Sequence, residues 1–144
     1  MAEIEPVGLL GVDHVGVAVA DLDAAIRFYE DVLGGRCVHV EQNEEQGVRE
    51  AMIAIGEGTT QIQLLAPSSP DSTIAKFLDT RGPGLQQLAY TVADIDAACE
   101  SLRANNIRLL YDSPRRGTAD SRINFIHPKD AGGVLIELVE PAPS

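Results

Sequence analysis

The sequence has few of the features that mark a secreted, membrane or nucleic-acid-binding protein. It contains only two cysteines, Cys37 and Cys99, far apart along the chain. We therefore expect no disulfide framework, and we expect a reducing, cytoplasmic location. No apolar run approaches the roughly 20 residues that a membrane-spanning helix needs. Residues 1–8 (MAEIEPVG) lack the basic and apolar blocks of a signal peptide, so we interpret them as a short leader into the first strand.

Basic residues are scarce as well: 11 Lys and Arg against 22 Asp and Glu give a formal net charge of −11. Nucleic acid is a poor candidate partner, because binding its phosphates needs a basic face. Four basic residues nevertheless fall between positions 115 and 129, namely Arg115, Arg116, Arg122 and Lys129. This basic segment is either a solvated loop or a local site for phosphate or carboxylate groups.

What the chain does contain is an internal repeat. Its 144 residues, 44% hydrophobic and 23% charged, are typical of one globular domain. The string HVGVAVADLDAA from His14 matches QLAYTVADIDAA from Gln87, and IQLLAP from Ile62 matches IELVEP from Ile136. The two offsets, 73 and 74 residues, are nearly equal at opposite ends of the copies. They therefore predict a duplicated module.

The residue pattern of each copy predicts a β-α-β-β-β module. An alternating strand leads into an Asp-rich helix start, at Asp21 and Asp23 and again at Asp94 and Asp96. The first helix carries Ala25, Phe28, Tyr29, Val32 and Leu33 at helical spacing, and the helices should end at residues 34–35 and 105–106. Further strands are expected near 36–40, 49–55 and 60–65, then near 108–111, 122–127 and 134–139. The first module then covers residues 8–67 and the second 84–141, joined by a linker, 68–83, with a short helix near 72–80.

Strand alternation sorts the side chains by face. Large apolar residues occupy the face that should pack on the helix. The opposite face carries one polar residue followed by small ones: His14, Gly16 and Ala18 in the first copy, Gln87, Ala89 and Thr91 in the second. Gln63 and Glu137 stand on the corresponding face of the last strands. Because small residues beside a polar group leave space, we expect a hollow there.

The repeat pairs His14 with Gln87 and Gln63 with Glu137. If the modules are related by a pseudo-twofold axis, these four side chains converge. All four carry lone pairs that a metal ion can accept. The alternative is four unrelated polar residues that are satisfied by backbone groups. Their equivalent positions in the repeat favour a metal site.

These residues resemble the vicinal oxygen chelate (glyoxalase/bleomycin resistance/dioxygenase) superfamily, and within it the methylmalonyl-CoA epimerases, from about Leu10 to Glu140. The strings that carry the resemblance are NEEQGVREAM (Asn43–Met52), STIAKFL (Ser72–Leu78) and GTADSRINFIHPKDAGGVLIEL (Gly117–Leu138). The resemblance implies an α+β fold, in which two paired β-α-β-β-β modules form a cup-shaped mixed sheet with helices outside. It also implies a homodimer and one divalent metal ion.

The metal ligands that the resemblance implies are His14, Gln63, Gln87 and Glu137. The position of Gln87 is usually a histidine, the second of a His-His pair, and here that pair is Gln86-Gln87. One nitrogen and three oxygen donors favour six-coordinate Co²⁺, Mn²⁺ or Mg²⁺ over tetrahedral Zn²⁺. We expect Co²⁺, bound more loosely than in relatives that have the histidine.

The implied reaction interconverts the (R)- and (S)-epimers of methylmalonyl-CoA by removing and returning the proton alpha to the thioester. Glu50 and Glu137 are the implied bases, and Glu137 is also a ligand. Glu50 shares its strand face with Met52, an apolar setting that suits a catalytic carboxylate, although a solvated strand glutamate is the alternative. The basic segment is the expected contact for the CoA phosphates.

Other activities of the same superfamily fit less well. A glyoxalase-like lyase usually has a glutamate where Gln63 stands. An extradiol dioxygenase needs two histidines and a carboxylate for iron, and His14 is the only histidine at a ligand position. A non-catalytic small-molecule binding protein would need neither the metal ligands nor Glu50, and Gln87 keeps this option open. We expect a structural role for His127 and packing roles for the cysteines, and assign no role to His39.

Overall fold

The computed structural model describes residues 5–144. The leader assigned above begins in residues 1–4, which lie outside this range. The described chain divides into two compact units, one formed by residues 14–86 and the other by residues 5–13 together with 87–144. Across residues 5–144, every helix is too short or too polar to cross a membrane.

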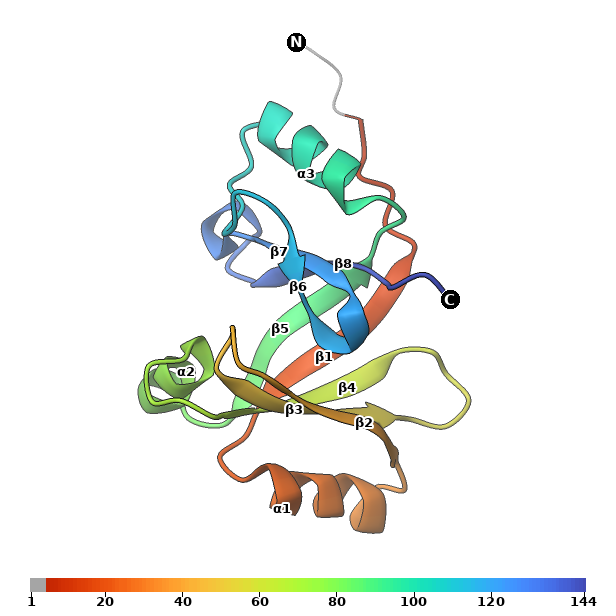
Figure 1. Cartoon of the computed structure of the whole chain (residues 1–144), viewed down its shortest axis with the longest axis vertical. Coiled ribbons are helices and arrows are strands. Elements are labelled where there is room, and N and C mark those ends of the chain that lie inside the picture. The colour runs from red at the N-terminus through yellow and green to blue at the C-terminus, as the bar shows by residue number, and fades with distance from the viewer. Residues whose placement is uncertain (1–4) are drawn as a thin grey trace. The chain divides into compact units, whose positions relative to one another are not determined.

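The unit of residues 14–86 holds a mixed four-stranded sheet (Figure 1). Its strands follow the order β2-β3-β4-β1, with β1 parallel to β4 and the other pairs antiparallel. The elements are β1 (Gly11–Ala18), which begins in the other unit, α1 (Leu22–Arg27), its π-helical continuation η1 (Phe28–Val32), β2 (Arg36–Asn43), β3 (Val48–Ala54), β4 (Gln61–Pro67) and α2 (Thr73–Arg81). The predicted strands and the linker helix of this half are confirmed.

Helix α1 forms where the aspartate signal predicts. The Asp21 side chain accepts the Ala24 N–H at 3.0 Å, and Leu22 packs in a core with Ala51, Ile53 and Leu64. Gly35 follows the helix because a Cβ there would lie 2.7 Å from the Ile53 side chain. The apolar stripe is buried only in part, since three of its residues are more than half exposed: Phe28, Val32 and Leu33.

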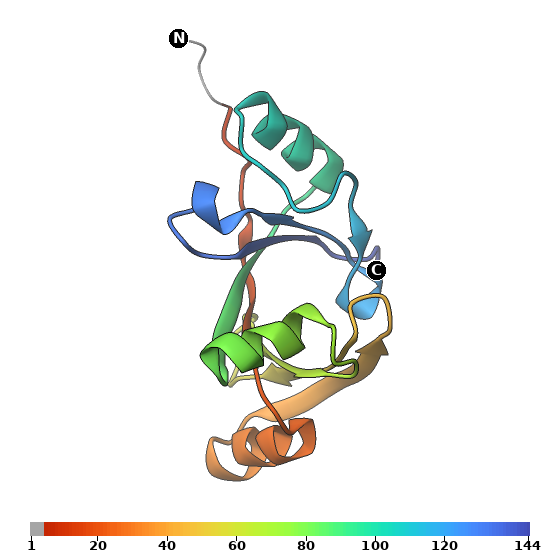
Figure 2. The same cartoon turned by 90° about the vertical axis from the view of Figure 1, so that its left-hand side faces the viewer.

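Helix α2 packs on the opposite face of the same strands. Its Ile74 is buried with Ala18, Val48 and Leu65, whereas α1 contacts the alternate residues of these strands. Figure 2 shows α1 and α2 on the two sides of β3 and β4. The predicted hollow is therefore wrong at Ala18, which is fully buried because α2 covers that end of the face.

The second unit repeats the topology of the first, with strand order β5-β8-β7-β6 and β5 parallel to β8. Its elements are β5 (Gly84–Thr91), α3 (Ile95–Ala104), β6 (Arg115–Arg116), β7 (Arg122–Ile126) and β8 (Ile136–Glu140), with 3-10 turns at Thr118–Asp120 and Pro128–Asp130. Asp94 caps α3 and Asn105 ends it, as predicted. The duplicated β-α-β-β-β module and the α+β class are confirmed.

Cys99 of α3 packs in the core of this unit with Ile95, Val92 and Leu138. Burial raises the pKa of its thiol, which fits a packing role. Ala89, on the other face of β5, is also fully buried, together with Ile123 and Val139. The hollow predicted at Ala89 is wrong for the same reason as at Ala18: large side chains from neighbouring elements fill the space.

The strand predicted near residues 108–111 is absent. Leu109 makes one isolated bridge to Ile126, and the short strand β6 forms further along instead. Two backbone hydrogen bonds still join residues 108–110 to β7: the Leu110 N–H donates to the Phe125 carbonyl and the His127 N–H to the Arg108 carbonyl, both at 2.9 Å. The pairing stops at Tyr111, beside the fully buried Asn124. Its Oδ1 accepts the Tyr111 N–H at 3.1 Å and its Nδ2 donates to the Tyr111 carbonyl at 3.0 Å. A side chain thus takes the place that a ladder partner would occupy.

Candidate active site

Two predicted site residues meet in the unit of residues 14–86. The Gln63 amide nitrogen donates to Glu50 Oε2 at 3.0 Å, and each residue is 3% exposed. The strands bring them together because β3 and β4 pair with Met52 opposite Gln63 and Glu50 opposite Leu65. Glu50 therefore shares its face with Met52, as predicted, and is a buried carboxylate rather than a solvated strand residue.

His14 is buried on the same face of this sheet. Strand β1 runs parallel to β4 with Gly16 directly opposite Gln63, and His14 precedes Gly16 by two residues. Because side chains two residues apart share a strand face, the imidazole and the Gln63 carboxamide project to one side. This unit thus gathers a histidine, an amide and a carboxylate on one face.

The second unit contains an equivalent contact. The Gln87 amide nitrogen donates to Glu137 Oε1 at 2.7 Å, and both residues are buried. Strand β5 pairs with β8 so that Ala89 stands opposite Glu137, just as Gly16 stands opposite Gln63 in the first unit. The repeat predicted that Gln63 and Glu137 are equivalent, and the strand register gives them equivalent positions in the two units.

The donor types at these positions fit a divalent cation. Both glutamines direct their amide nitrogen at a carboxylate, so the atom that each could offer to a metal is its oxygen. Together with the His14 imidazole and the Glu137 carboxylate, this is the nitrogen-and-oxygen set that Mg²⁺, Mn²⁺ and Co²⁺ accept. Within residues 5–144 there is no metal-sized group of three His, Cys, Asp or Glu side chains. The predicted set contains only two residues of those types, so the amide oxygens have to complete it.

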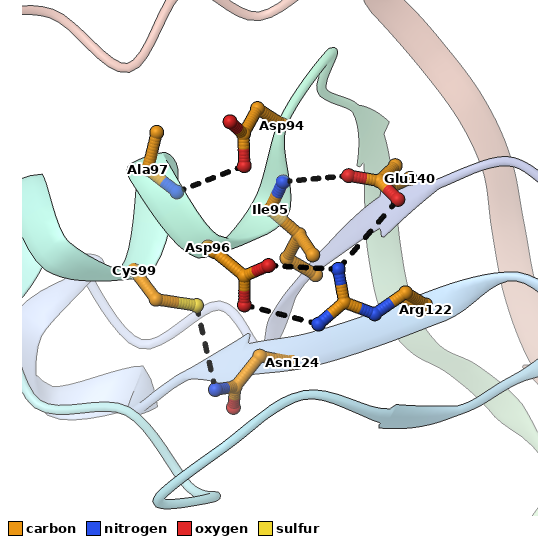
Figure 3. Close-up of polar contacts among 8 residues, drawn as sticks. All are labelled: Asp94, Ile95, Asp96, Ala97, Cys99, Arg122, Asn124 and Glu140. Carbon is orange, nitrogen blue, oxygen red and sulfur yellow. Dashed lines mark hydrogen bonds and ion pairs between the residues drawn. The ribbon is translucent and has the colours of Figure 1, made fainter.

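The basic segment does not act as one cluster. Arg122 donates to both carboxylate oxygens of Asp96, at 2.9 and 3.0 Å, and lies 3.7 Å from Glu140 (Figure 3). These hydrogen bonds hold the pKa of Asp96 below its usual value. Glu140 in turn accepts the Ile95 N–H at 3.1 Å. Arg122 therefore ties the start of α3 to β7 and β8.

The other basic residues have separate surroundings. Arg116 donates to Asp120 at 2.6 Å across the 3-10 turn between β6 and β7. The Arg115 guanidinium lies over the Tyr111 ring, 4.0 Å from its centroid. Lys129 donates its backbone N–H to His127 Nδ1 at 3.1 Å, which gives His127 the structural role that was expected.

One residue on the Glu50 face was left unassigned by the sequence. His39 of β2 contacts Glu41 at 2.6 Å, and Glu41 stands directly opposite Glu50 in the β2–β3 ladder. The pairing contains a β-bulge between Cys37 and His39. No sequence pattern in β2 marks this bulge, so alternation alone would not have found the two residues.

Comparison with known proteins gives consistent matches over both units. The pattern of the Glyoxalase/Bleomycin resistance protein/Dioxygenase superfamily matches residues 13–125. The mitochondrial methylmalonyl-CoA epimerase of Mus musculus is 40% identical over 138 residues, which is 94% of this chain and 76% of the mouse protein.

Solved structures are similar over nearly the whole chain. The crystal structure of methylmalonyl-CoA epimerase from Mycobacterium tuberculosis has a TM-score of 0.91 and 64% identity, covering 94% of this chain and 90% of that one. A variant of the Streptomyces coelicolor methylmalonyl-CoA epimerase, in complex with 2-nitronate-propionyl-CoA, has a TM-score of 0.91 and 45% identity, covering 94% of this chain and all of that one.

Proposed function

Because this chain belongs to the glyoxalase/bleomycin resistance protein/dioxygenase superfamily and, within it, to the methylmalonyl-CoA epimerases, we propose that it interconverts (R)- and (S)-methylmalonyl-CoA. The observation that carries the proposal is the pair of buried acid–amide contacts, Glu50 with Gln63 and Glu137 with Gln87. Each unit thereby holds one carboxylate in a fixed orientation away from bulk water. Removing a proton from carbon and returning one requires two such groups.

We propose that His14, Gln63, Gln87 and Glu137 hold one divalent metal ion, with Co²⁺ as the expected ion. When bound, such an ion would stabilise the negative charge that develops on the thioester oxygen. The support for this assignment is the burial of all four residues and the orientation of the two carboxamides, whose nitrogens are already used by carboxylates.

The side chains of this chain would move the proton. Glu50 removes it from the carbon between the thioester carbonyl and the free carboxylate of one epimer, and the C–H electron pair passes into the enolate. Protonated Glu137 then returns a proton to the opposite side of that carbon. The reverse reaction exchanges the two roles. Gln63 and Gln87 donate hydrogen bonds that orient the carboxylates throughout.

For the CoA phosphates, the basic segment of Arg115, Arg116, Arg122 and Lys129 remains the proposed contact. We also propose a cytoplasmic homodimer with the acyl-CoA as its partner and neither nucleic acid nor membrane. The free Cys37 and Cys99 fit the location, and the dimer rests on the family resemblance.

Replacing Glu50 by Gln tests the assignment. In heavy water the wild-type protein should introduce deuterium alpha to the thioester starting from either epimer. Glu50→Gln should lose this exchange for one epimer by a factor on the order of 10² or more, the usual size of a general-base contribution. Metal binding should persist, because a glutamine oxygen can still accept the Gln63 N–H. NMR of each purified epimer and metal analysis would measure both effects.

Glu57→Gln is a matched control, since Glu57 is an exposed glutamate in the turn between β3 and β4 of the same unit. It should leave both exchange reactions unchanged. Retained exchange of both epimers by Glu50→Gln would overturn the role of Glu50. A wild-type protein that is loaded with metal but exchanges neither epimer would favour the non-catalytic binding protein.

A further inference from the structure

A second titratable pair lies beside the proposed base. His39 Nε2 and Glu41 Oε1 on β2 are 2.6 Å apart. In the antiparallel β2–β3 ladder Glu41 stands directly opposite Glu50, and His39 stands opposite Met52. Directly opposed residues project from the same face with their Cβ atoms about 5 Å apart. The carboxyl groups of Glu41 and Glu50 are thus within reach of each other directly or through one water molecule.

The bulge in β2 creates this arrangement. Cys37 stands opposite Ile53 and packs in the α1 core, but His39 stands opposite the next residue, Met52, so Val38 is an extra residue in the strand. The extra residue reverses the alternation and directs His39 and Glu41 to the Glu50 face. Without the extra residue, Val38 and Val40 would lie on the Glu50 face. In the structure these two valines are instead about half exposed, Val38 at 53% and Val40 at 50%. Bulges of this kind re-aim side chains near active sites.

Solvent exposure rises along the three groups. Glu50 is 3% exposed, the Glu41 side chain 14% and the His39 side chain 40%. We propose that Glu41 and His39 form a proton relay between Glu50 and solvent. This proposal rests on the proposed function, since it takes Glu50 as a base. Neither residue touches the reacting carbon, so both are positioning residues that act through Glu50.

An epimerase that uses two bases ends each turnover with both bases in the wrong protonation state for the next. After one turnover Glu50 carries the proton that it removed, and Glu137 has lost the proton that it gave. The protein cannot process the same epimer again until both are reset. In the relay, the Glu50 carboxyl gives its proton to the Glu41 carboxylate, Glu41 passes it to His39 Nε2, and the imidazolium releases a proton to water. Glu50 is left as a carboxylate and water gains one proton, while Glu137 takes up one proton from water, so both groups are reset with no net change in protons. An imidazole suits the last step because it has two ring nitrogens, one that can take up a proton and another that can release one.

The variants His39→Gln and Glu41→Gln test the relay. We expect kcat to fall on the order of tenfold or more, because resetting the free protein then limits turnover. The ratio kcat/KM should change less than about twofold, because it reports the reaction of protein that is already reset. Added imidazole buffer should restore kcat of His39→Gln, since it can carry the proton that the side chain no longer carries. Steady-state kinetics at increasing imidazole concentration would measure all three effects.

Val40→Thr is the matched control, because Val40 lies on the opposite face of the same strand and should leave both constants unchanged. Unchanged kcat in both relay variants would overturn the relay. The role of Glu50 as a base would still be tested separately by the Glu50→Gln variant. A parallel fall of kcat and kcat/KM that imidazole does not relieve would indicate a structural role and would also overturn it. If Glu50→Gln keeps exchange of both epimers, the proposed function itself fails.

Discussion

The carboxamide of Asn124 makes four contacts in a fully buried position. Its oxygen accepts the backbone N–H groups of Tyr111 and Phe125, at 3.1 and 2.8 Å. Its nitrogen donates to the Tyr111 carbonyl at 3.0 Å and to the Cys99 sulfur at 3.5 Å. The Asn124 side chain therefore holds the Tyr111 backbone in place, and the Tyr111 ring lies against the Arg115 guanidinium. At the scale of residues, one amide positions a proposed substrate contact.

Replacing Asn124 by Leu should lower the free energy of unfolding by about 3 kcal/mol, because it removes the two hydrogen bonds to the partly buried backbone of Tyr111 and the one to the Phe125 N–H. Urea denaturation at neutral pH would measure the loss. Asn105→Ala is the comparison: the Asn105 side chain donates one hydrogen bond at the end of α3, so about 1 kcal/mol or less is expected. Equal losses in the two variants would contradict the assigned role of Asn124.

At the scale of elements, the segment without a strand is anchored by an ion pair. Arg108 donates to Asp130 from its guanidinium at 2.9 Å, through two nitrogens, and from its backbone N–H at 2.9 Å. Asp130 belongs to the 3-10 turn before β8. The hydrogen bonds from Arg108 hold the pKa of the Asp130 carboxyl well below its ordinary value of 3.8. The pair thus joins two loops where the ladder is interrupted.

Asp130→Asn should destabilise the protein in a pH-dependent way. A carboxyl whose pKa is lowered by folding stabilises the folded state above its unfolded pKa and loses that contribution as the pH falls through the lowered value. The difference between wild type and Asp130→Asn should therefore be largest at neutral pH and narrow below about pH 4. Denaturation curves of both proteins at neutral pH and below about pH 4 would measure this difference in the free energy of unfolding. A difference that stays constant or widens in acid would rule out this ion pair as its source.

At the scale of the whole molecule, the proposed metal should couple stability to activity. Chelation should abolish epimerisation, and added Co²⁺ should restore it. The same addition should raise the melting temperature, because an ion that binds only the folded protein stabilises it in proportion to RT ln(1 + [L]/Kd). Gln87→His should increase this rise at equal Co²⁺ concentration, since imidazole is the stronger donor. Differential scanning calorimetry would measure the shift without relying on activity.

Gln42→His provides the control, because Gln42 is exposed and stands opposite Arg49, on the other face of β2 from Glu41. It should leave the response to Co²⁺ unchanged. Full activity in a demonstrably metal-free preparation would contradict the metal assignment while leaving the two acid–amide pairs in place.

The sequence by itself determined two kinds of feature: those that follow from the alternation of polar and apolar residues along a strand or helix, and those that follow from the internal repeat. Side chains alternate along any strand, so Glu50 could be assigned to the face of Met52 and Gln63 to the face away from the helix before their contact was known. The repeat made Gln87 and Glu137 their counterparts, and the aspartates marked both helix starts. These inferences hold because backbone geometry sets side-chain direction independently of distant contacts.

Only the tertiary structure decided the rest. The bulge at Val38 turns His39 and Glu41 toward Glu50. Asn124 takes over the backbone hydrogen bonds of Tyr111, where the pairing of the predicted strand with β7 stops, and α2 covers Ala18 where a hollow was expected. Each of these outcomes depends on a pairing between segments far apart in the chain. A single extra residue, or one buried side chain that binds the backbone, changes such a pairing without altering the local pattern of polar and apolar residues.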